Sequence, residues 1–329
     1  MKKKEPHVIV TGGAGYVGSV LVRRLLKKGY KVRVIDKLLF GSSSIRELRA
    51  NPNFSFVRAD IRDISVMKGL LKGASGVFHM AAYVGEHAYR GQEREAGDVN
   101  KNASFKIISL SAQSGIKRFI FTSTCSNYGQ TDTAGFAKEE TKLNPLSQYA
   151  EDKIAVEEFL KANSGKNNFR PVICRCATVY GISPRMRFDL LINELVRDAA
   201  LRKKIQVYAP ESWRPFVHVD DLARALVDIF ETPAKKMSNM VFNIGQANYQ
   251  KRSIIKMLAE RMENFAVDYK KGEFDKRNYR VSFMRFKKKF NFKFRKEIGL
   301  EISRINDAIK EKRFKDPFRG CYDNYLKKG

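Results

Sequence analysis

Tyr149 and Lys153 are the residues whose types and spacing suggest acid–base chemistry. Four residues apart on a helix, two side chains project from the same face, about one turn apart. An ammonium group beside a phenol stabilises the phenolate, which lowers the pKa of the tyrosine from about 10 toward neutral pH. The pair therefore indicates a tyrosine that acts as a general base. The same spacing also arises by chance on solvated helices, so the rest of the chain has to decide between the two interpretations.

A glycine-rich pattern near the start of the chain indicates a second kind of chemistry. Gly12, Gly15 and Gly18 follow a β-branched run at 7–11 and open an apolar period typical of a helix. In such a turn the first glycine permits tight folding, the second lets the backbone approach a pyrophosphate, and the third lets the helix pack closely on the sheet. Asp36 ends the next strand, where a carboxylate accepts hydrogen bonds from ribose hydroxyls and repels a 2′-phosphate. The pattern predicts a dinucleotide site that favours NAD over NADP.

The elements that must position these residues alternate along the first half of the chain. Apolar runs predict strands at 7–11, 31–36, 54–60, 76–82, 118–124 and 171–176. Helical periods lie between them, at 17–28, 64–71, 98–114 and 147–163. This alternation predicts an α/β fold, a Rossmann-type doubly wound parallel sheet with helices on both faces.

The rhythm changes after about residue 177. Helices are predicted at 188–201, 220–231, 251–263 and 300–310, and short strands at 205–208, 216–219 and 241–244. We interpret this half as a smaller α+β lobe. The expected domains are 1–176 for the dinucleotide, with interleaved segments near 216–245, and 177–329 mainly for the substrate.

Composition excludes several classes of protein. Of the 329 residues, 43% are hydrophobic and 30% charged, which is typical of a globular protein and not of a disordered one. No apolar run is long enough to span a bilayer, and the basic start leads into a strand, not an export signal. The four cysteines have neither zinc-ligand spacing nor a disulfide pattern, so no metal is predicted and a cytoplasmic location is expected.

The net charge is +28, from 63 Lys and Arg against 35 Asp and Glu. Such a charge attracts polyanions, or it reflects solvated lysine-rich surfaces. The lysines are scattered over several predicted helices, so the second interpretation is favoured and nucleic acid is disfavoured as a partner. The stretch 283–296 interleaves aromatic and cationic residues, which suits base stacking. The same alternation describes a half-buried strand with lysines in water, and this interpretation is favoured.

Taken together, the motifs resemble those of the extended short-chain dehydrogenase/reductases, in the NAD-dependent nucleotide-sugar epimerase/dehydratase group. The likeness covers nearly the whole chain and is greatest to UDP-glucose 4-epimerase-like and nucleotide-heptose C4 dehydrogenase-like members. It implies NAD as cofactor. The residues that it places at the cofactor are Gly12, Gly15, Tyr16, Val17, Gly18, Asp36, Asp60, Ile61, Ala81, Ala82, Asn100, Ser123, Tyr149 and Lys153.

The resemblance also implies a mechanism. Tyr149 removes the proton of a sugar hydroxyl while hydride passes from the same carbon to NAD. Lys153 lowers the pKa of Tyr149 and bonds the nicotinamide ribose, and Thr124 orients the hydroxyl. The residues that it places at a nucleotide-diphospho-sugar are Ser123, Thr124, Tyr149, Thr178, Arg187, Arg214 and Arg277.

Some of these assignments have alternatives. Arg214 is expected to grip the diphosphate with Arg277 as a second phosphate ligand, whereas Arg187 faces either the substrate or an ion pair with Asp189. His218 lies in a predicted strand and is expected to be structural. The helices that start at Asp98 and Ser147 resemble those of a dimer interface, so a homodimer is expected.

The reaction is inferred from differences within the group. Dehydratases carry Asp-Glu after the threonine, where this chain has Cys125 and Ser126, so dehydration is disfavoured. Thr178 replaces a common asparagine, and the stretch 183–190 resembles C4-oxidising heptose dehydrogenases. The prediction is a 4-epimerase; the alternatives are a C4 dehydrogenase or ketoreductase of a nucleotide-linked hexose or heptose. An alternative of another class is a nucleic-acid-binding protein on a Rossmann fold.

Overall fold

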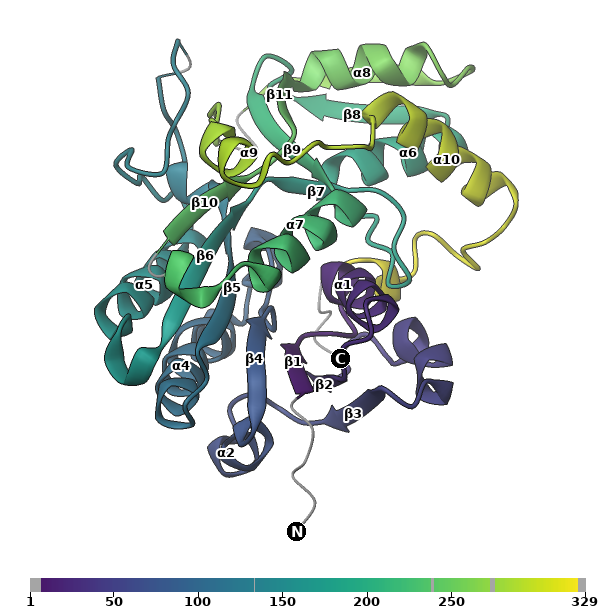
Figure 1. Cartoon of the computed structure of the whole chain (residues 1–329). Coiled ribbons are helices and arrows are strands. Elements are labelled where there is room, and N and C mark those ends of the chain that lie inside the picture. The colour runs from purple at the N-terminus through teal and green to yellow at the C-terminus, as the bar shows by residue number, and fades with distance from the viewer. Residues whose placement is uncertain (1–6, 133, 238–239, 273–275, 325–329) are drawn as a thin grey trace. The chain divides into compact units, whose positions relative to one another are not determined.

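The computed structural model describes residues 7–132, 134–237, 240–272 and 276–324. Its largest feature is a seven-stranded sheet with strand order β10-β6-β5-β4-β1-β2-β3 (Figure 1). The strands are β1 (His7–Thr11), β2 (Val32–Asp36), β3 (Phe54–Arg58), β4 (Ala74–His79), β5 (Arg118–Thr124), β6 (Arg170–Cys176) and β10 (Met240–Ile244). The pairings of β1 with β2 and β4, of β2 with β3 and of β4 with β5 are parallel. The predicted Rossmann-type sheet is confirmed.

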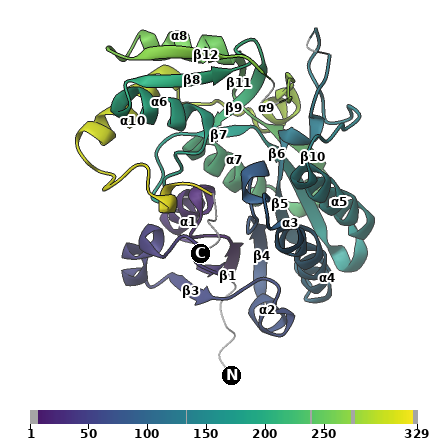
Figure 2. The ribbon, with the colours of Figure 1, turned by 180° about the vertical axis from the view of Figure 1, so that it is seen from behind.

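Helices cover both faces of this sheet, which explains why its central strands are nearly continuous apolar runs. The helices are α1 (Tyr16–Lys27), α2 (Ile64–Leu71), α3 (Glu93–Gly97), α4 (Ser104–Gln113), α5 (Gln148–Asn163) and α7 (Val219–Glu231). Figures 1 and 2 show α2, α4 and α5 on one face and α1 and α7 on the other. On the second face the ring of Phe230 in α7 packs 5.0 Å from that of Phe78 in β4.

The strand order reverses between β1 and β4, which are neighbours in the sheet although two strands lie between them in the chain. Ligands of doubly wound sheets bind beyond the carboxyl ends of the strands at such a switch point. Gly12 follows β1 there with φ +71°, and a Cβ on it would lie 2.7 Å from the backbone nitrogen of Ala81, just after β4. The absence of a side chain at Gly12 therefore lets the two strand ends approach.

The chain divides into two compact units. The first comprises Met1–Thr124, Ser147–Arg175 and Ala223–Phe242, and the second comprises Cys125–Leu146, Cys176–Leu222 and Asn243–Gly329. The second unit holds a three-stranded sheet of order β11-β9-β7 and the parallel pair β12–β8. The remaining elements are β7 (Thr178–Tyr180), α6 (Leu191–Leu201), β8 (Lys204–Tyr208), β9 (Trp213–His218), β11 (Ala247–Gln250), α8 (Lys251–Ala259), β12 (Ala266–Lys270), α9 (Met284–Phe290) and α10 (Ile298–Lys310).

The stretch 283–296 buries apolar side chains, as expected, with Phe286 and Phe292 in the core, but the strand is wrong, because residues 284–290 form the helix α9. Phe286 and Phe290, four residues apart, stack on one face of that helix with ring centroids 4.8 Å apart. Asn291 ends the helix in the left-handed conformation, with φ 45°, and Phe292 then folds back to within 5.0 Å of Phe286. Aromatic packing at helical spacing therefore prevails over the alternating pattern.

His218 is buried in β9, as the structural interpretation expects. Its Nδ1 accepts a hydrogen bond from the backbone N–H of Asp220 at 3.1 Å. Its Nε2 lies 3.2 Å from the Glu301 carboxylate, which also accepts from the backbone of Ile182. The histidine thereby joins the end of β9 to α10.

A second buried histidine joins β1 to β4 and α4. Thr11 and His79 face each other in the register of the two strands, and Nδ1 of His79 lies 2.9 Å from the Thr11 hydroxyl. Its Nε2 lies 2.9 Å from the Ser104 hydroxyl, which donates its own hydrogen to the Asn100 carbonyl. Ser104 therefore accepts from Nε2–H, which leaves Nδ1 as the acceptor and the ring neutral. Burial, with the nearby charge of Lys153, lowers the pKa of His79 to about 3.

This histidine predicts a pH-dependent stability. At a pH below 6.5, the ordinary pKa of histidine, the unfolded chain binds a proton at His79 and the folded chain does not. The free energy of unfolding therefore decreases as the pH is lowered, down to about pH 3. Between pH 6.5 and 4.5 we expect a loss of about 2–3 kcal/mol of unfolding free energy. The glutamates with lowered pKa, Glu47 and Glu301, begin to lose their contribution at the lower edge of this window, in the wild type and in His79→Gln alike, so the difference between the two proteins isolates His79. Urea unfolding across it should show the slope in the wild type and a flatter profile in His79→Gln; equal slopes would contradict the assignment.

Candidate active site

Helix α5 positions the tyrosine–lysine pair. Its N-cap is Ser147, whose hydroxyl accepts a hydrogen bond from the backbone N–H of Ala150. The helix therefore begins just before Tyr149, and both Tyr149 and Lys153 are buried against the sheet. The Lys153 ammonium donates to the carbonyl of Thr122 at 2.9 Å and lies 6.0 Å from the centroid of the Tyr149 ring. The structure thus brings the pair to the carboxyl end of β5, whose last residue is Thr124.

A second tyrosine supports the ring of Tyr149. Tyr89 meets that ring edge-on, with centroids 6.0 Å apart, and donates its hydroxyl hydrogen to Asp152 at 2.9 Å. Burial and the Asp152 charge raise the pKa of Tyr89 far above its ordinary value, so Tyr89 stays a neutral phenol. Sequence reasoning missed this residue because it lies in an irregular segment with no motif of its own.

Asn100 holds the loop that carries Tyr89. Its side-chain amide exchanges hydrogen bonds with the backbone N–H and carbonyl of Tyr83, both at 2.8 Å, and donates to the Tyr89 hydroxyl at 2.6 Å. It lies in a π-helical turn, Asp98–Ala103, directly before α4. Such turns are frequent at functional sites. The resemblance assigns Asn100 to the cofactor, and the structure shows its amide engaged with the protein.

The glycine loop joins β1 to α1 at the switch point. Gly15 is the N-cap of α1, so Tyr16, Val17 and Gly18 supply the first backbone N–H groups of the helix. A Cβ on Gly18 would lie 2.2 Å from the carbonyl oxygen of Gly12, so only glycine permits this approach. The start of a helix, whose first N–H groups have no partner within the helix, beside a close backbone turn is the arrangement that holds phosphates.

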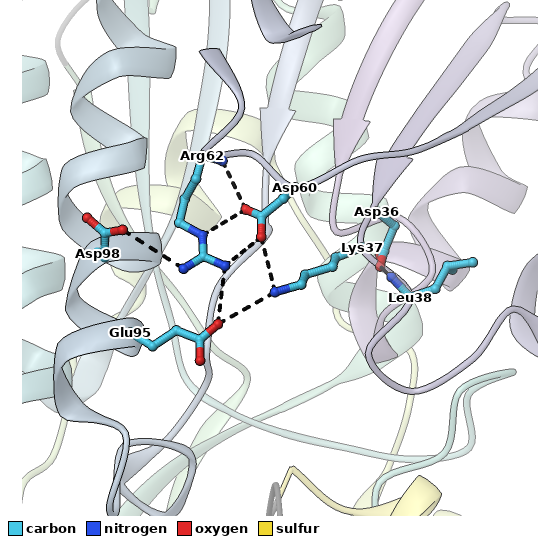
Figure 3. Close-up of polar contacts among 7 residues, drawn as sticks. All are labelled: Asp36, Lys37, Leu38, Asp60, Arg62, Glu95 and Asp98. Carbon is cyan, nitrogen blue, oxygen red and sulfur yellow. Dashed lines mark hydrogen bonds and ion pairs between the residues drawn. The ribbon is translucent and has the colours of Figure 1, made fainter. Parts of the chain in front are cut away.

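Asp36 lies between the glycine loop and the turn after β2. Its carboxylate accepts from the backbone N–H of Ala14 at 3.0 Å and from that of Leu38 at 2.8 Å. Figure 3 shows the second of these contacts. Two backbone donors fix the orientation of the carboxylate at the end of β2, as the ribose interaction predicted for it requires.

Asp60 lies in a network of charges shown in Figure 3. Arg62 donates to both oxygens of its carboxylate, at 3.1 and 2.7 Å, and Lys37 lies 3.1 Å away. These contacts, led by Arg62, hold the pKa of Asp60 well below its ordinary value. Glu95 lies 3.2 Å from Arg62 and 3.5 Å from Lys37, and Asp98 lies 3.9 Å from Arg62.

The charge balance of this network bears on the choice of cofactor. Lys37 directly follows Asp36 in the chain, and a cation at this place would by itself suit a 2′-phosphate. The structure surrounds Lys37 and Arg62 with three carboxylates, those of Asp60, Glu95 and Asp98. With Asp36 the region carries more negative than positive charge, which disfavours a further phosphate. The arrangement supports NAD over NADP.

In the second unit Arg214 and Arg277 gather around Tyr279. The Arg214 guanidinium lies 5.8 Å from the centroid of the Tyr279 ring. The Asn278 side chain accepts from the backbone N–H of Trp213 at 2.9 Å, which aligns the Arg277 segment with β9. Burial raises the pKa of Tyr279 against the opposing effect of the two arginines, so it stays neutral beside them. Two guanidinium groups around a neutral phenol suit a diphosphate.

Arg187 takes part in an ion pair. Its guanidinium donates to both oxygens of Asp189, at 2.9 and 2.6 Å, and both side chains are buried. The Asp189 carboxylate also accepts from the backbone of Asn324 at 3.3 Å. Of the two interpretations left open by the sequence, the structure shows the ion pair. Thr178 lies in β7, opposite Phe216 of β9.

Glu157 and Arg175 form a buried ion pair that sequence reasoning missed. Glu157 lies on α5 one turn beyond Lys153, and Arg175 interrupts the apolar run of β6. Their closest atoms are 2.7 Å apart, and the Ser123 hydroxyl donates to Glu157 at 2.5 Å. An acid on the buried face of a helix and a cation within a core strand are the signals that would have found them.

Comparison with known proteins gives consistent results. The model of a family described as "NAD dependent epimerase/dehydratase family" matches residues 8–245. A dTDP-glucose 4,6-dehydratase of Actinoplanes sp. is 32% identical over 67% of this chain and 71% of its own length. A UDP-glucose 4-epimerase of Streptomyces lividans is 28% identical over 73% and 76%.

Solved structures agree with these sequence matches. The UDP-glucose 4-epimerase of Thermotoga maritima, crystallised with UDP-glucose, has a TM-score of 0.83 at 25% identity, over 94% of this chain and 100% of that one. The UDP-glucuronic acid 4-epimerase of Bacillus cereus, in complex with UDP-glucuronic acid and NAD, has a TM-score of 0.82 at 25% identity, over 93% and 99%. Within the described ranges, no helix is long and apolar enough to cross a membrane.

Proposed function

Since the chain belongs to the NAD-dependent epimerase/dehydratase family, we propose that it oxidises and re-reduces C4 of a nucleotide-diphospho-sugar, with 4-epimerisation as the net reaction. The observation that carries the proposal is the buried pair Tyr149 and Lys153, held against the end of β5 beside Thr124. The 4-epimerases among the similar proteins support the choice of reaction.

The residues present fit NAD. The close backbone at Gly12 and Gly18, where a Cβ would clash, suits a pyrophosphate at the start of α1. We assign the adenosine ribose to Asp36, and the adenine to Asp60 and Ile61. The other assigned contacts are those of Ala81, Ala82, Ser123, Tyr149 and Lys153, and the cofactor-binding domain is residues 1–176 with interleaved segments near 216–245. When bound, NAD supplies the acceptor for the hydride of C4.

The chain's own residues move the proton and hold the sugar. Tyr149, as phenolate, takes the proton of the 4-hydroxyl, because Lys153 favours the charged form of the phenol. Thr124 holds the hydroxyl in line by a hydrogen bond. Arg214 and Arg277, from the lobe 177–329, bind the diphosphate, where two fixed guanidinium groups restrict the motion of the substrate.

Dehydration is disfavoured although a dehydratase is among the relatives. Elimination of water needs an acid near the sugar. The positions at which the resemblance expects an acid hold Cys125 and Ser126, which carry no carboxyl group. Cys125 is buried, and the Ser126 hydroxyl lies 3.5 Å from an Arg277 nitrogen.

A second candidate is net C4 dehydrogenation or ketoreduction, in which the cofactor turns over. Thr178, in place of the common asparagine, is the observation that favours it. Arg187 gives it little support, since its guanidinium is paired with Asp189.

One experiment separates the two reactions. Purified protein is incubated with UDP-glucose, UDP-glucuronic acid or dTDP-glucose, with and without added NAD, while the reduced-nicotinamide absorbance and the products are followed. Epimerisation gives the C4 epimer without accumulation of NADH. A rise of NADH stoichiometric with substrate would establish the dehydrogenase instead. Failure of every sugar to react or bind, together with salt-sensitive RNA or DNA retention on filters, would favour the nucleic-acid alternative.

We further propose a cytoplasmic homodimer. Helices α4 and α5 are the expected interface, and half-buried Phe105 and Phe159 already stack across them with ring centroids 4.4 Å apart. Analytical ultracentrifugation gives the oligomeric state directly.

A further inference from the structure

One face of α5 carries three functional groups, not two. Tyr149, Lys153 and Glu157 follow one another at intervals of four residues, so they form one stripe along the helix. All three are buried. The proposed function uses the first two, and it gives Glu157 no role.

Two members of this stripe hold consecutive residues of β5. Lys153 donates to the carbonyl of Thr122 at 2.9 Å, and the Ser123 hydroxyl donates to Glu157 at 2.5 Å. The next residue is Thr124, the last of the strand. The strand end is therefore fixed at two successive positions, immediately before the residue assigned to the sugar hydroxyl.

Arg175 keeps Glu157 in place. Its Nε lies 3.1 Å from both carboxylate oxygens, and its Nη2 lies 2.7 Å from Oε2. The side chain of Glu157 is 0% exposed and that of Arg175 is 2% exposed. Because the desolvation of such a pair cancels most of its attraction, apolar side chains of similar volume often stabilise a protein as well or better. Stability alone therefore gives no reason for a charged pair here.

We propose that Glu157, charge-balanced by Arg175, is a positioning residue for catalysis. It accepts the Ser123 hydrogen and so holds Thr124 and the Thr122 carbonyl in register with Tyr149 and Lys153. An apolar side chain of equal size fills the same volume but accepts no hydrogen bond. The inference rests on the proposed function for its catalytic consequence, whereas its structural part is independent of any substrate.

Two double variants isolate the acceptor. Glu157→Met with Arg175→Met removes both charges and the acceptor. Glu157→Gln with Arg175→Met removes both charges but keeps a side-chain carbonyl that accepts from Ser123. The two variants share Arg175→Met and differ only at residue 157, where Gln brings the carbonyl acceptor together with an amide NH2 group and Met brings neither. Neither variant leaves a buried charge unpaired. The single variant Glu157→Gln is avoided, because it leaves Arg175 uncompensated.

The first readout needs no activity. Backbone hydrogen exchange of a peptide covering residues 118–128 should quicken at least tenfold in the double-Met variant and stay near the wild type in the Gln–Met variant, at equal global stability. The second readout is turnover of whichever sugar the wild type epimerises. We expect kcat about 10–100-fold lower in the double-Met variant, with KM and the Kd for NAD within threefold, since the interaction acts on the transition state. The Gln–Met variant should recover most of kcat.

The outcomes are distinct. A double-Met variant with wild-type exchange and wild-type kcat would overturn the inference, and so would equal loss in both doubles. A wild type that turns over no sugar refutes the proposed function, while the exchange comparison still decides whether Glu157 holds the strand end. Should a double variant fail to fold, Ser123→Ala retains the ion pair. Because Ser123 is itself assigned to the cofactor and the sugar, hydrogen exchange of residues 118–128 is then the readout: exchange at least tenfold faster supports the inference, and wild-type exchange overturns it.

Discussion

Tyr149→Phe is expected to lower kcat at least about 1000-fold, while the Kd for NAD stays within about twofold of the wild type. The substitution removes the hydroxyl that takes the proton of the sugar and keeps the ring. The edge contact with Tyr89 and the Lys153 hydrogen bond to Thr122 therefore persist. Product formation from the wild-type substrate, followed by mass spectrometry, gives kcat, and calorimetric titration with NAD gives Kd.

Tyr30→Phe is the matched control for this experiment. Tyr30 lies in the same unit and donates its hydroxyl hydrogen to Glu231 near the surface at 3.3 Å. Tyr30→Phe loses the same atom at a position whose ring and hydroxyl contacts are with Phe230 and Glu231 of α7, so its kcat should equal that of the wild type. A Tyr149→Phe enzyme that retains more than a tenth of wild-type turnover would refute Tyr149 as the base.

The parts of the fold that the sequence predicts are those with local causes. The run at 8–10 is apolar and β-branched, and it forms a buried strand. Gly12, Gly15 and Gly18 lie where a tight turn, a helix start and a close contact need them. Because each signal lies within a few residues of its effect, periodicity and turn chemistry are sufficient to read it.

Non-local partners are what the sequence leaves out. The strand β12 is only half apolar and exists because it pairs with β8, 62 residues earlier in the chain, where Ala266 lies opposite Lys204. Glu157 and Arg175 are each charged and would be expected at the surface; each is buried because the other neutralises it. Each charge stands out within its own segment, but neither segment identifies the other as its partner.

The charged network at Asp60, in the cofactor site, also depends on partners from distant parts of the chain. Lys37 follows Asp36 directly, and as an unpaired cation it would weaken the preference for NAD. Its neutralisation depends on Asp60 and Glu95, which other parts of the chain supply. The preference is therefore a property of the folded cluster and not of the strand end alone.

Gly18→Ala is expected to lower both the free energy of unfolding and the affinity for NAD. The new Cβ would lie 2.2 Å from the Gly12 carbonyl oxygen and 2.8 Å from the Cα of Gly13. Both are backbone atoms, so no side chain can turn aside, and α1 must move away from the end of β1. Helix propensity acts in the opposite direction, since alanine within a helix is favoured over glycine by about 1 kcal/mol. The clash outweighs it.

Gly69 provides the control, because it also lies inside a helix, α2, and a Cβ there meets nothing within 4 Å. We expect Gly69→Ala to raise the unfolding free energy by up to about 1 kcal/mol. Gly18→Ala should lower it by about 2–4 kcal/mol and weaken NAD binding at least about 100-fold, as the N–H groups of the first turn leave the phosphate position. Urea unfolding and calorimetric titration with NAD measure both quantities. Wild-type affinity for NAD in Gly18→Ala would show that the start of α1 does not hold the pyrophosphate, and the cofactor would have to be assigned elsewhere in the fold.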